Sequence, residues 1–355
     1  MSEQINRETI VNTILKDKNR TPKRDSGEAF APANIALCKY WGKRGSELNL
    51  PVTNSLSVSL GDRGAKTRIS VISGSSAIPN VISDEIYLNG KLIAETPFTT
   101  RLSSFLDLFR DNLNCFYRVE TDVNIPIAAG LASSAAGFAS IVKALDNLYA
   151  WELPASLLSV LARLGSGSAA RSIWQGFVEW HKGERRDGMD SLGLPISHAW
   201  PELRIGLLIL NSEEKSLSSR TAMEMTVKTS PFYREWPQKV ALDLQCLKMA
   251  IETKDFNLLG KTSESNALAM HALMMTAYEP IIYSTPETLK TIQKIWALRK
   301  EGISIYFTQD AGPNLKLLFL QKDEADIVAM MKSTLINGQT LDILSPIWTE
   351  GVKSQ

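Results

Sequence analysis

Residues 124–145, NIPIAAGLASSAAGFASIVKAL, constrain the fold of this chain more than any other stretch. The stretch begins with Asn-Ile-Pro, passes Gly130 and the pair Ser133-Ser134, and continues in small and apolar residues that favour a helix. A glycine- and serine-rich loop that opens a helix leaves backbone N–H groups free at the positive end of the helix dipole. The stretch therefore predicts a phosphate site, in which a serine hydroxyl is a donor or a magnesium ligand. The alternative is a small-residue helix packed closely against a sheet.

Composition restricts the class of protein. The chain has 355 residues, and its 44% hydrophobic and 22% charged residues suit a soluble protein with two domains. The formal net charge of +1 predicts no general attraction to nucleic acid or to an anionic membrane. No apolar run is long enough to cross a bilayer, and the first 28 residues lack the apolar core of a secretion signal. We therefore expect a cytoplasmic protein.

The positions of the cysteines and histidines in the sequence do not predict a metal site. The three cysteines, Cys38, Cys115 and Cys246, are far apart and read as free thiols in a reducing compartment. The three histidines are equally scattered, so a metal centre or catalytic triad built on histidine is a weak hypothesis.

Residues 1–28 form a polar extension with a short helix predicted at 9–16, and the sequence does not decide whether it packs on the body. The character changes at residue 29, where APANIALCKYWGKR predicts a strand at 34–38 followed by lysines and aromatics beside a glycine. That pattern fits an anion-binding edge or an amphipathic turn with solvated lysines. Alternating residues 55–60 predict a half-buried strand, and further strands are expected at 66–72 and 85–88, the latter ending in the hairpin turn Asn89-Gly90. A helix is expected at 99–113.

The string GSGSAARS at 165–172 resembles a dinucleotide-binding fingerprint, but we reject that interpretation. Such a fingerprint must follow a strand, whereas a helical pattern at 154–164 precedes this one. A serine-rich loop with one arginine better suits an anionic group on a small molecule. Strands are expected at 176–180 and at 201–210, where the chain crosses to a second domain.

The second half predicts a mixed α+β domain. After a polar loop at 211–220, helices are expected at 239–253, 256–273, 286–301 and 323–336, and a short strand closes the chain. Strands at 303–307 and 315–320 flank TQDAGPN, which places the carboxylate of Asp310 between two strands. The GKT at 260–262 is not a phosphate-binding loop, because Asp255 stands where that motif needs glycine.

Five strings, APANIALCKYWGKR, LNLPVTNSLSVSL, PIAAGLASSAAGFAS, GSGSAARS with GFVEW, and TQDAGPN, together resemble the diphosphomevalonate decarboxylase family. That family belongs to the galacto-, homoserine, mevalonate and phosphomevalonate kinase superfamily. The resemblance runs from about residue 29 to the C-terminus and leaves out the extension 1–28. It implies a two-domain α+β fold, with a ribosomal-protein-S5-like domain at 29–205, a ferredoxin-like domain at 206–355 and the active site in the cleft between them.

The resemblance also implies an activity. It is the ATP- and Mg²⁺-dependent decarboxylation of mevalonate 5-diphosphate to isopentenyl diphosphate, in an enzyme that forms a homodimer. Three alternatives stay open: a kinase that only phosphorylates the C3 hydroxyl, a decarboxylase of mevalonate or its 5-monophosphate, and a catalytically silent nucleotide-binding paralogue.

Three residues carry the implied chemistry. Asp310 matches the aspartate that orients the C3 hydroxyl and takes its proton, and Arg171 matches the arginine that holds the substrate carboxylate. Lys43 matches a lysine near the substrate and the aspartate, whose charge would keep Asp310 ionised. The structural alternatives are a turn aspartate and a surface salt bridge.

The remaining site residues follow from the same matches. The expected substrate contacts are Tyr40, Trp41, Gly42, Lys43, Arg101, Ser166, Gly167, Ser168, Arg171, Ser219 and Met223. The expected nucleotide contacts are Asn34, Gly130, Leu131, Ser133 and Ser134, with Ser134 also a metal ligand. Structural roles remain open for Arg101, Ser219 and Asn34.

Three departures from the family pattern stand out. Glu85 replaces an arginine that often helps to hold the diphosphate, Gln309 replaces an apolar residue, and Cys38 occupies a position that is usually aliphatic and is expected to lie in the core.

Overall fold

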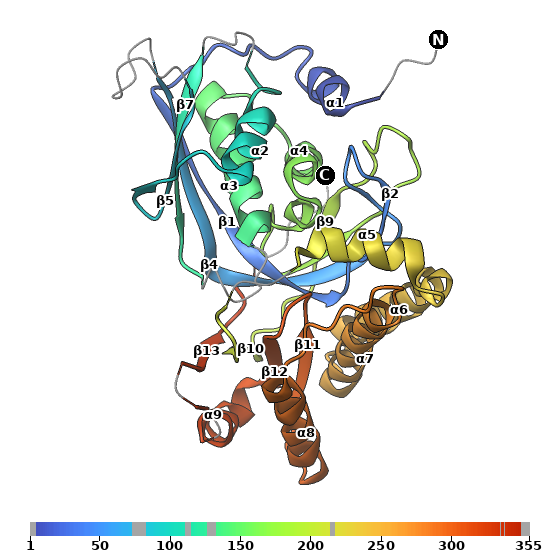
Figure 1. Cartoon of the computed structure of the whole chain (residues 1–355). Coiled ribbons are helices and arrows are strands. Elements are labelled where there is room, and N and C mark those ends of the chain that lie inside the picture. The colour runs from blue at the N-terminus through green and yellow to red at the C-terminus, as the bar shows by residue number, and fades with distance from the viewer. Residues whose placement is uncertain are drawn as a thin grey trace.

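Two antiparallel-rich sheets, one in each half of the chain, organise the protein (Figure 1). The computed structural model describes residues 5–72, 83–110, 115–125, 133–213, 217–333, 335–336 and 338–348. The strands are β1 Ser26–Cys38, β2 Lys43–Gly45, β3 Leu50–Pro51, β4 Ser55–Ile72, β5 Glu85–Leu88, β6 Lys91–Leu92, β7 Phe116–Val123, β8 Phe177–Trp180, β9 Gly193–Ile196, β10 Leu203–Ile209, β11 Tyr306–Gln309, β12 Leu315–Leu320 and β13 Thr340–Leu344. The helices are α1 Arg7–Ile14, α2 Pro97–Leu106, α3 Ser133–Tyr149, α4 Ala155–Gly165, α5 Ser219–Thr229, α6 Trp236–Thr253, α7 Phe256–Met275, α8 Pro286–Lys300 and α9 Glu324–Lys332.

The N-terminal sheet has the order β6-β5-β7-β4-β8-β9, with β1 paired to β4. Helices α2, α3 and α4 cover one face of it (Figure 1). Strand β4 corrects one expectation, because residues 55–61 are buried throughout rather than half-buried. Leu56, Val58 and Leu60 join a hydrophobic cluster, while Ser55 and Ser59 make hydrogen bonds within the protein. The alternation therefore separates two buried faces of β4, one apolar and one polar, rather than a buried face and a solvent-exposed face.

Local signals explain several elements. The predicted hairpin at Asn89-Gly90 is confirmed, since both residues have positive φ (49° and 74°) and Leu88 pairs with Lys91. Helix α2 begins at Pro97 behind a Thr96–Thr99 capping box and ends at Leu106, so the predicted 99–113 was shifted and too long. Strand β7 was not predicted.

The C-terminal sheet has the order β11-β12-β10-β13 and packs beside α6, α7 and α8 (Figure 1). The predicted helices near 239–253, 256–273, 286–301 and 323–336 are confirmed as α6, α7, α8 and a shorter α9. Helix α5 was missed: its first two residues lay in the predicted polar loop, and Ser218 caps it by accepting from the Thr221 backbone N–H.

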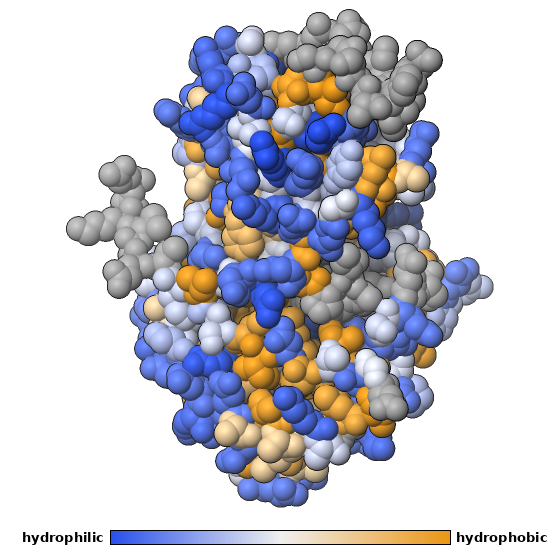
Figure 2. All heavy atoms as spheres, turned by 90° about the vertical axis from the view of Figure 1, so that its left-hand side faces the viewer, coloured by the Kyte–Doolittle hydropathy of each residue, from blue (hydrophilic) through white to orange (hydrophobic). Residues whose placement is uncertain are grey.

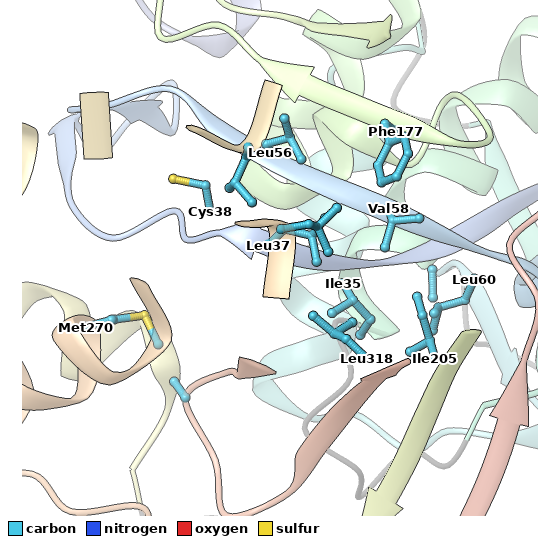
Figure 3. Packing of buried hydrophobic residues seen from close by; sticks show 14 of the residues in the cluster. Ile35, Leu37, Cys38, Leu56, Val58, Leu60, Phe177, Ile205, Met270 and Leu318 are labelled. Atoms are coloured by element: carbon cyan, nitrogen blue, oxygen red, sulfur yellow. The ribbon is translucent and has the colours of Figure 1, made fainter. Parts of the chain in front are cut away.

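One hydrophobic cluster continues across the boundary of the two domains. Ile35 and Leu60 of the N-terminal sheet lie beside Ile205 and Leu318 of the C-terminal sheet (Figure 3). Cys38 is fully buried in this cluster, as expected. Because both domains share this core, side chains at the ends of their strands are held in fixed relative positions.

The N-terminal extension packs on the body. Helix α1 lies near α4 (Figure 1), and Ile10, Val11 and Ile14 are buried with side chains of α3 and α4. The indole Nε1 of Trp151 donates to the Asn19 carbonyl at 2.8 Å. The described part of the extension is therefore integrated with the N-terminal domain.

On the face shown in Figure 2, hydrophilic side chains dominate the upper, N-terminal domain, and hydrophobic ones gather on the lower, C-terminal domain. None of the helices in the described residues is long and apolar enough to cross a membrane.

Candidate active site

Asp310 lies directly after β11, in the turn that leads to β12, and two buried lysines hold its carboxylate. Lys39 Nζ is 2.7 Å from Oδ1 and Lys316 Nζ is 3.1 Å from Oδ2. Both lysine side chains are 2% exposed, whereas the Asp310 side chain is 25% exposed. The carboxylate is thus the accessible member of a buried ionic triad.

The triad fixes the charge state of Asp310. Burial by itself would raise the pKa of this carboxyl, but the charges of Lys316 and Lys39 hold that pKa well below its usual range. Asp310 is therefore ionised at neutral pH.

The backbone around Asp310 is equally constrained. His271 Nε2 is 3.0 Å from the Asp310 carbonyl oxygen, and burial lowers the pKa of His271 to about 4, so its imidazole is neutral at pH 7. Gln309, one of the departures from the family pattern, is fully buried, and its Nε2 donates to the Gly312 carbonyl at 2.9 Å. Its amide therefore stabilises the turn that presents the carboxylate.

The expected pairing of Lys43 with Asp310 is wrong. Strand β1 ends at Cys38 and aims Lys39 at the C-terminal domain, where the Lys39 backbone N–H also donates to Asn266 Oδ1 at 2.8 Å. The chain then turns at Gly42, and Lys43 Nζ instead donates to Asn49 Oδ1 at 2.8 Å. The sequence analysis included Lys39 only among the lysines at the end of the predicted strand. It did not identify Lys316, although a single charged residue in the apolar strand LKLLFL was a signal that could have been used.

Arg171 lies in the 3₁₀ turn η2, Gly167–Arg171, and is 3% exposed. Its Nη1 donates to Ser55 Oγ, and its Nε and Nη2 lie 3.4 and 3.3 Å from Asn34 Oδ1. Burial lowers the pKa of Arg171 to about 10, and the charge of Asp310 opposes that shift. Arg171 is therefore a buried cation near the triad with no carboxylate bonded to it among the described residues.

Asn34 takes the structural role that the sequence left open. Its Oδ1 faces Arg171, and its Nδ2 donates to Ser172 Oγ at 2.7 Å and to the Ser168 carbonyl at 3.5 Å. These contacts position η2 and the arginine; a nucleotide contact for Asn34 stays a prediction.

The two serine-rich segments meet in space. Ser134, near the start of α3, has its Oγ 3.4 Å from Ser166 Oγ, just before η2. Gly167 lets Tyr40 and Trp180 pack closely against η2, because an added Cβ would come within 2.9 Å of both Tyr40 Oη and the Trp180 ring. Gly130 and Leu131 lie outside the described residues, as does the side chain of Ser133.

The segment Tyr40-Trp41-Gly42 forms a wall beside Arg171. Tyr40 packs edge-on against Trp180 at 4.7 Å between ring centroids. Tyr40 Oη and Trp41 Nε1 are buried polar atoms without a hydrogen-bond partner in the described part of the structure. Gly42 has φ +115°, and a Cβ there would lie 1.7 Å from Tyr233 Oη. Glycine is therefore required at this turn.

A cationic group flanks this wall. Burial, together with the positive charge of Arg220, lowers the pKa of Lys43 to about 8. Arg101 on α2 stacks its guanidinium over the Phe138 ring at 5.3 Å, and its Nε is buried without a hydrogen-bond partner among the described atoms. Ser219 begins α5 and directly precedes Arg220, whose charge acts on both Lys43 and Arg101. Met223, by contrast, is 7% exposed and packs in the interdomain cluster.

Glu85 does not belong to the cationic group. It is buried on β5, and its Oε2 accepts from Arg118 Nε at 2.8 Å. Its negative charge is therefore compensated by its own ion pair.

Two family models cover most of the chain. The diphosphomevalonate decarboxylase-like N-terminal domain matches residues 31–193, and the mevalonate 5-diphosphate decarboxylase C-terminal domain matches residues 205–347. The chain belongs to the diphosphomevalonate decarboxylase family. Both matches begin after the extension, so α1 lies outside the regions that define the family.

Named relatives of this family align over most of their length. The diphosphomevalonate decarboxylase of Candida albicans is 34% identical over 321 residues, which cover 86% of this chain and 87% of that protein. The Aspergillus fumigatus protein is 36% identical over 344 residues (89% and 84%), and the human protein 35% over 322 residues (84% and 78%).

Solved structures confirm the two-domain fold. The mevalonate diphosphate decarboxylase of Staphylococcus aureus superposes with a TM-score of 0.84 at 34% identity, covering 92% of this chain and 96% of that one. The decarboxylase MDDEF, solved in complex with MVAPP, AMPPCP and magnesium, gives 0.82 at 38% identity, with coverage of 90% and 96%. The expected family, two-domain architecture and fold class are thereby confirmed.

Proposed function

We propose that this protein catalyses the ATP-dependent decarboxylation of mevalonate 5-diphosphate to isopentenyl diphosphate, releasing ADP, phosphate and CO₂. The observation that carries the proposal is the Asp310 carboxylate, held by Lys39 and Lys316 where both domains meet, with Arg171 nearby. We infer mevalonate 5-diphosphate as the substrate because both domains match models of the diphosphomevalonate decarboxylase family.

The chemistry needs an activated leaving group. A carboxylate beta to a tertiary alcohol has no electron sink, so CO₂ cannot leave readily. Transfer of the γ-phosphoryl group from ATP to the C3 oxygen displaces that oxygen's proton and gives a phosphate ester and ADP. The C3–O bond then breaks and phosphate takes its electron pair. The pair of the C1–C2 bond forms the C2=C3 double bond, and C1 leaves as CO₂.

Asp310 suits the first step. Its ionised carboxylate accepts a hydrogen bond from the C3 hydroxyl and orients that oxygen towards the γ-phosphorus. In a loose phosphoryl-transfer transition state the hydroxyl becomes acidic only as the new bond forms, so a carboxylate of lowered pKa is a sufficient proton acceptor. Lys39 and Lys316 keep it charged.

Arg171 suits the second step. Its planar guanidinium, fixed by Asn34 and Ser55, holds the substrate carboxylate in the orientation that lets CO₂ leave. Tyr40, whose Oη is buried and unpartnered, and the hydroxyls of Ser166 and Ser168 are further substrate donors in this proposal.

ATP and Mg²⁺ fit the residues present. No cluster of three His, Cys, Asp or Glu side chains suited to a metal occurs among the described residues. A serine hydroxyl with phosphate oxygens and waters suits Mg²⁺, and Ser134 is the side chain we assign to it. When bound, Mg²⁺ neutralises charge on the nucleotide phosphates. We place those phosphates at the loop containing Gly130, Leu131 and Ser133.

We further propose a domain division at 29–205 and 206–355, a cytoplasmic location and a homodimer.

The homodimer is supported by exposed apolar side chains on α6 and α7. Leu242, Met249 and Met275 among them are more than half exposed. Light scattering of the purified protein tests the dimer, and a monomeric mass at micromolar concentration refutes it.

The deciding assay follows CO₂ and ADP together from mevalonate 5-diphosphate, with and without ATP and Mg²⁺. Equal amounts of both products support the decarboxylase. ADP without CO₂ means a C3 kinase, and a strong preference for the 5-monophosphate overturns the diphosphate assignment. Neither product from any of these substrates means a silent nucleotide-binding protein.

A further inference from the structure

An open pocket of about 620 Å³ lies between the N-terminal extension and α2. It is lined by Arg7, Glu95, Thr96, Pro97, Thr100, Arg101 and Ser104. Arg7 is the first residue of α1 and lies outside the matched family region. The extension therefore contributes a cation to a pocket that also holds Arg101, one of the predicted substrate contacts.

Arg7 is held in place by its own helix and by the body. Asn6 caps α1 by accepting from the Thr9 backbone N–H, and the next turn buries Ile10 and Val11. Arg7 Nε donates to the Glu47 carbonyl at 2.8 Å and lies 3.7 Å from its carboxylate. Its two Nη groups make no hydrogen bond within the described structure and remain available to a ligand.

The pocket has an excess of positive charge. Burial and the charges of Arg220 and Arg7 lower the pKa of Arg101, and Arg7 and Arg101 also contribute to the lowered pKa of Lys43. The nearby carboxylates do not neutralise this group: Glu95 is exposed on the pocket rim, Glu47 is 61% exposed, and Glu224 opposes only the shift of Lys43. Arg7 and Arg101 line the pocket, and Lys43 and Arg220 lie close enough to repel Arg101, so the pocket favours a multivalent anion.

The pocket chemistry is that of a phosphate site. Two guanidinium groups can each present paired N–H donors to phosphate oxygens. Thr96, Pro97 and Thr100 at the start of α2 lie on the same wall, so the positive end of this helix borders the pocket. Lys43 does not line the pocket, but the charges of Arg7 and Arg101 act on it, and it directly follows the Tyr40-Trp41-Gly42 segment of the active site.

We propose that Arg7 of the N-terminal extension, together with Arg101, binds the terminal phosphate of the 5-diphosphate. This assignment deepens the proposed function and rests on it. It makes the extension a specificity element, because a 5-monophosphate lacks the group that reaches this pair. Loss of Arg7 weakens binding of the diphosphate and leaves the reacting centre at Asp310 unchanged.

The experiment compares the full-length wild type with Arg7→Gln, Arg7→Lys and the matched control Lys16→Gln. Lys16 lies just beyond the same helix, is 73% exposed and lines no part of the pocket. We measure kcat and KM for mevalonate 5-diphosphate and the 5-monophosphate, KM for ATP, and the affinity for inorganic pyrophosphate by calorimetry. Melting temperature is recorded for each variant.

We expect Arg7→Gln to raise KM for the diphosphate and to weaken pyrophosphate binding by about tenfold, the loss of one charge-assisted hydrogen bond. Its kcat stays within about twofold, and its KM for the monophosphate and for ATP is unchanged. Arg7→Lys recovers part of the affinity, because it restores the charge but not the paired donors. Lys16→Gln behaves as the wild type.

The outcomes separate the two proposals. A wild type that releases no CO₂ overturns the proposed function, whereas the pyrophosphate affinities of wild type and Arg7→Gln still decide the role of Arg7. Equal pyrophosphate affinities in those two proteins overturn the inference, with or without activity. A lowered melting temperature shared by Arg7→Gln and Arg7→Lys, with no rescue by lysine, assigns Arg7 a structural role and also overturns it.

Discussion

Replacing Asp310 by asparagine tests both the charge arrangement and the chemistry. The substitution keeps the shape of the side chain but removes the anion between two lysines that are each 2% exposed. Lys39 and Lys316 are then left buried and close together without a counterion. The variant should fold less stably and should also lose its acceptor for the C3 proton.

The magnitude follows from the burial. Removing one partner of a buried ion pair costs about 3–5 kcal/mol, and we expect the lower end because the Asp310 side chain is 25% exposed. An unfolding entropy of roughly 2.1 cal/mol/K per residue over 355 residues gives about 0.75 kcal/mol/K. The lower end, about 3 kcal/mol, should therefore lower the melting temperature by about 4 °C. Turnover should fall by roughly 10³-fold, with substrate binding largely retained.

The pH dependence of the melting temperature is an independent test, because the direction of the change can be derived. In the wild type burial lowers the pKa of Lys39 and the charge of Asp310 opposes that shift, so without Asp310 the folded pKa falls further. The unfolded state then binds more protons than the folded state below the ordinary lysine pKa, and stability rises with pH. The melting temperature should increase more steeply between about pH 7 and pH 9.5 in the variant than in the wild type.

Differential scanning calorimetry at the two pH values is the assay, with Asp342→Asn as control. Asp342 pairs with Arg63 at 3.3 Å, but both side chains are more than a third exposed, so its loss should cost no more than about 1 kcal/mol. If Asp310→Asn melts like this control, with the wild-type pH slope, the buried ionic triad is refuted. Normal turnover in Asp310→Asn would remove the aspartate from the mechanism.

Three further outcomes are expected. Arg171→Lys should lower turnover by about 10²-fold with little change in KM for ATP, since one ammonium cannot replace a two-pronged guanidinium; a change below threefold in coupled kinetics would contradict this. Gly42→Ala should lower stability in urea unfolding by more than about 2 kcal/mol, because its Cβ would strike Tyr233, while Gly312→Ala, whose Cβ has open space, should cost less than half as much. Lys43, with a pKa of about 8, is charged below that pH and neutral above it, so KM for the diphosphate should rise above about pH 8; Lys43→Met should lose that dependence, and an unchanged KM profile would exclude Lys43 from the site.

Much of the secondary structure could be predicted because its signals are local. Thr285 followed by Pro286 starts α8, and Asn89-Gly90 closes a hairpin, through interactions within a few residues. Helix α5 and the burial of β4 could not be predicted in this way. Their polar residues resemble solvent-facing ones until another part of the chain covers them.

The sequence by itself determined the family, the place of Asp310 between two strands, and the residue types gathered near the site. Only the tertiary structure decided that Lys39 rather than Lys43 meets that carboxylate, although both lie in KYWGK. Lys39 and Asp310 are 271 positions apart, and the packing of β1 against the C-terminal domain sets their 2.7 Å contact. Arg7 likewise reaches the pocket beside Arg101 only because α1 buries its apolar face on the N-terminal domain. Such contacts depend on how distant surfaces pack, and no local pattern encodes which charges that packing brings together.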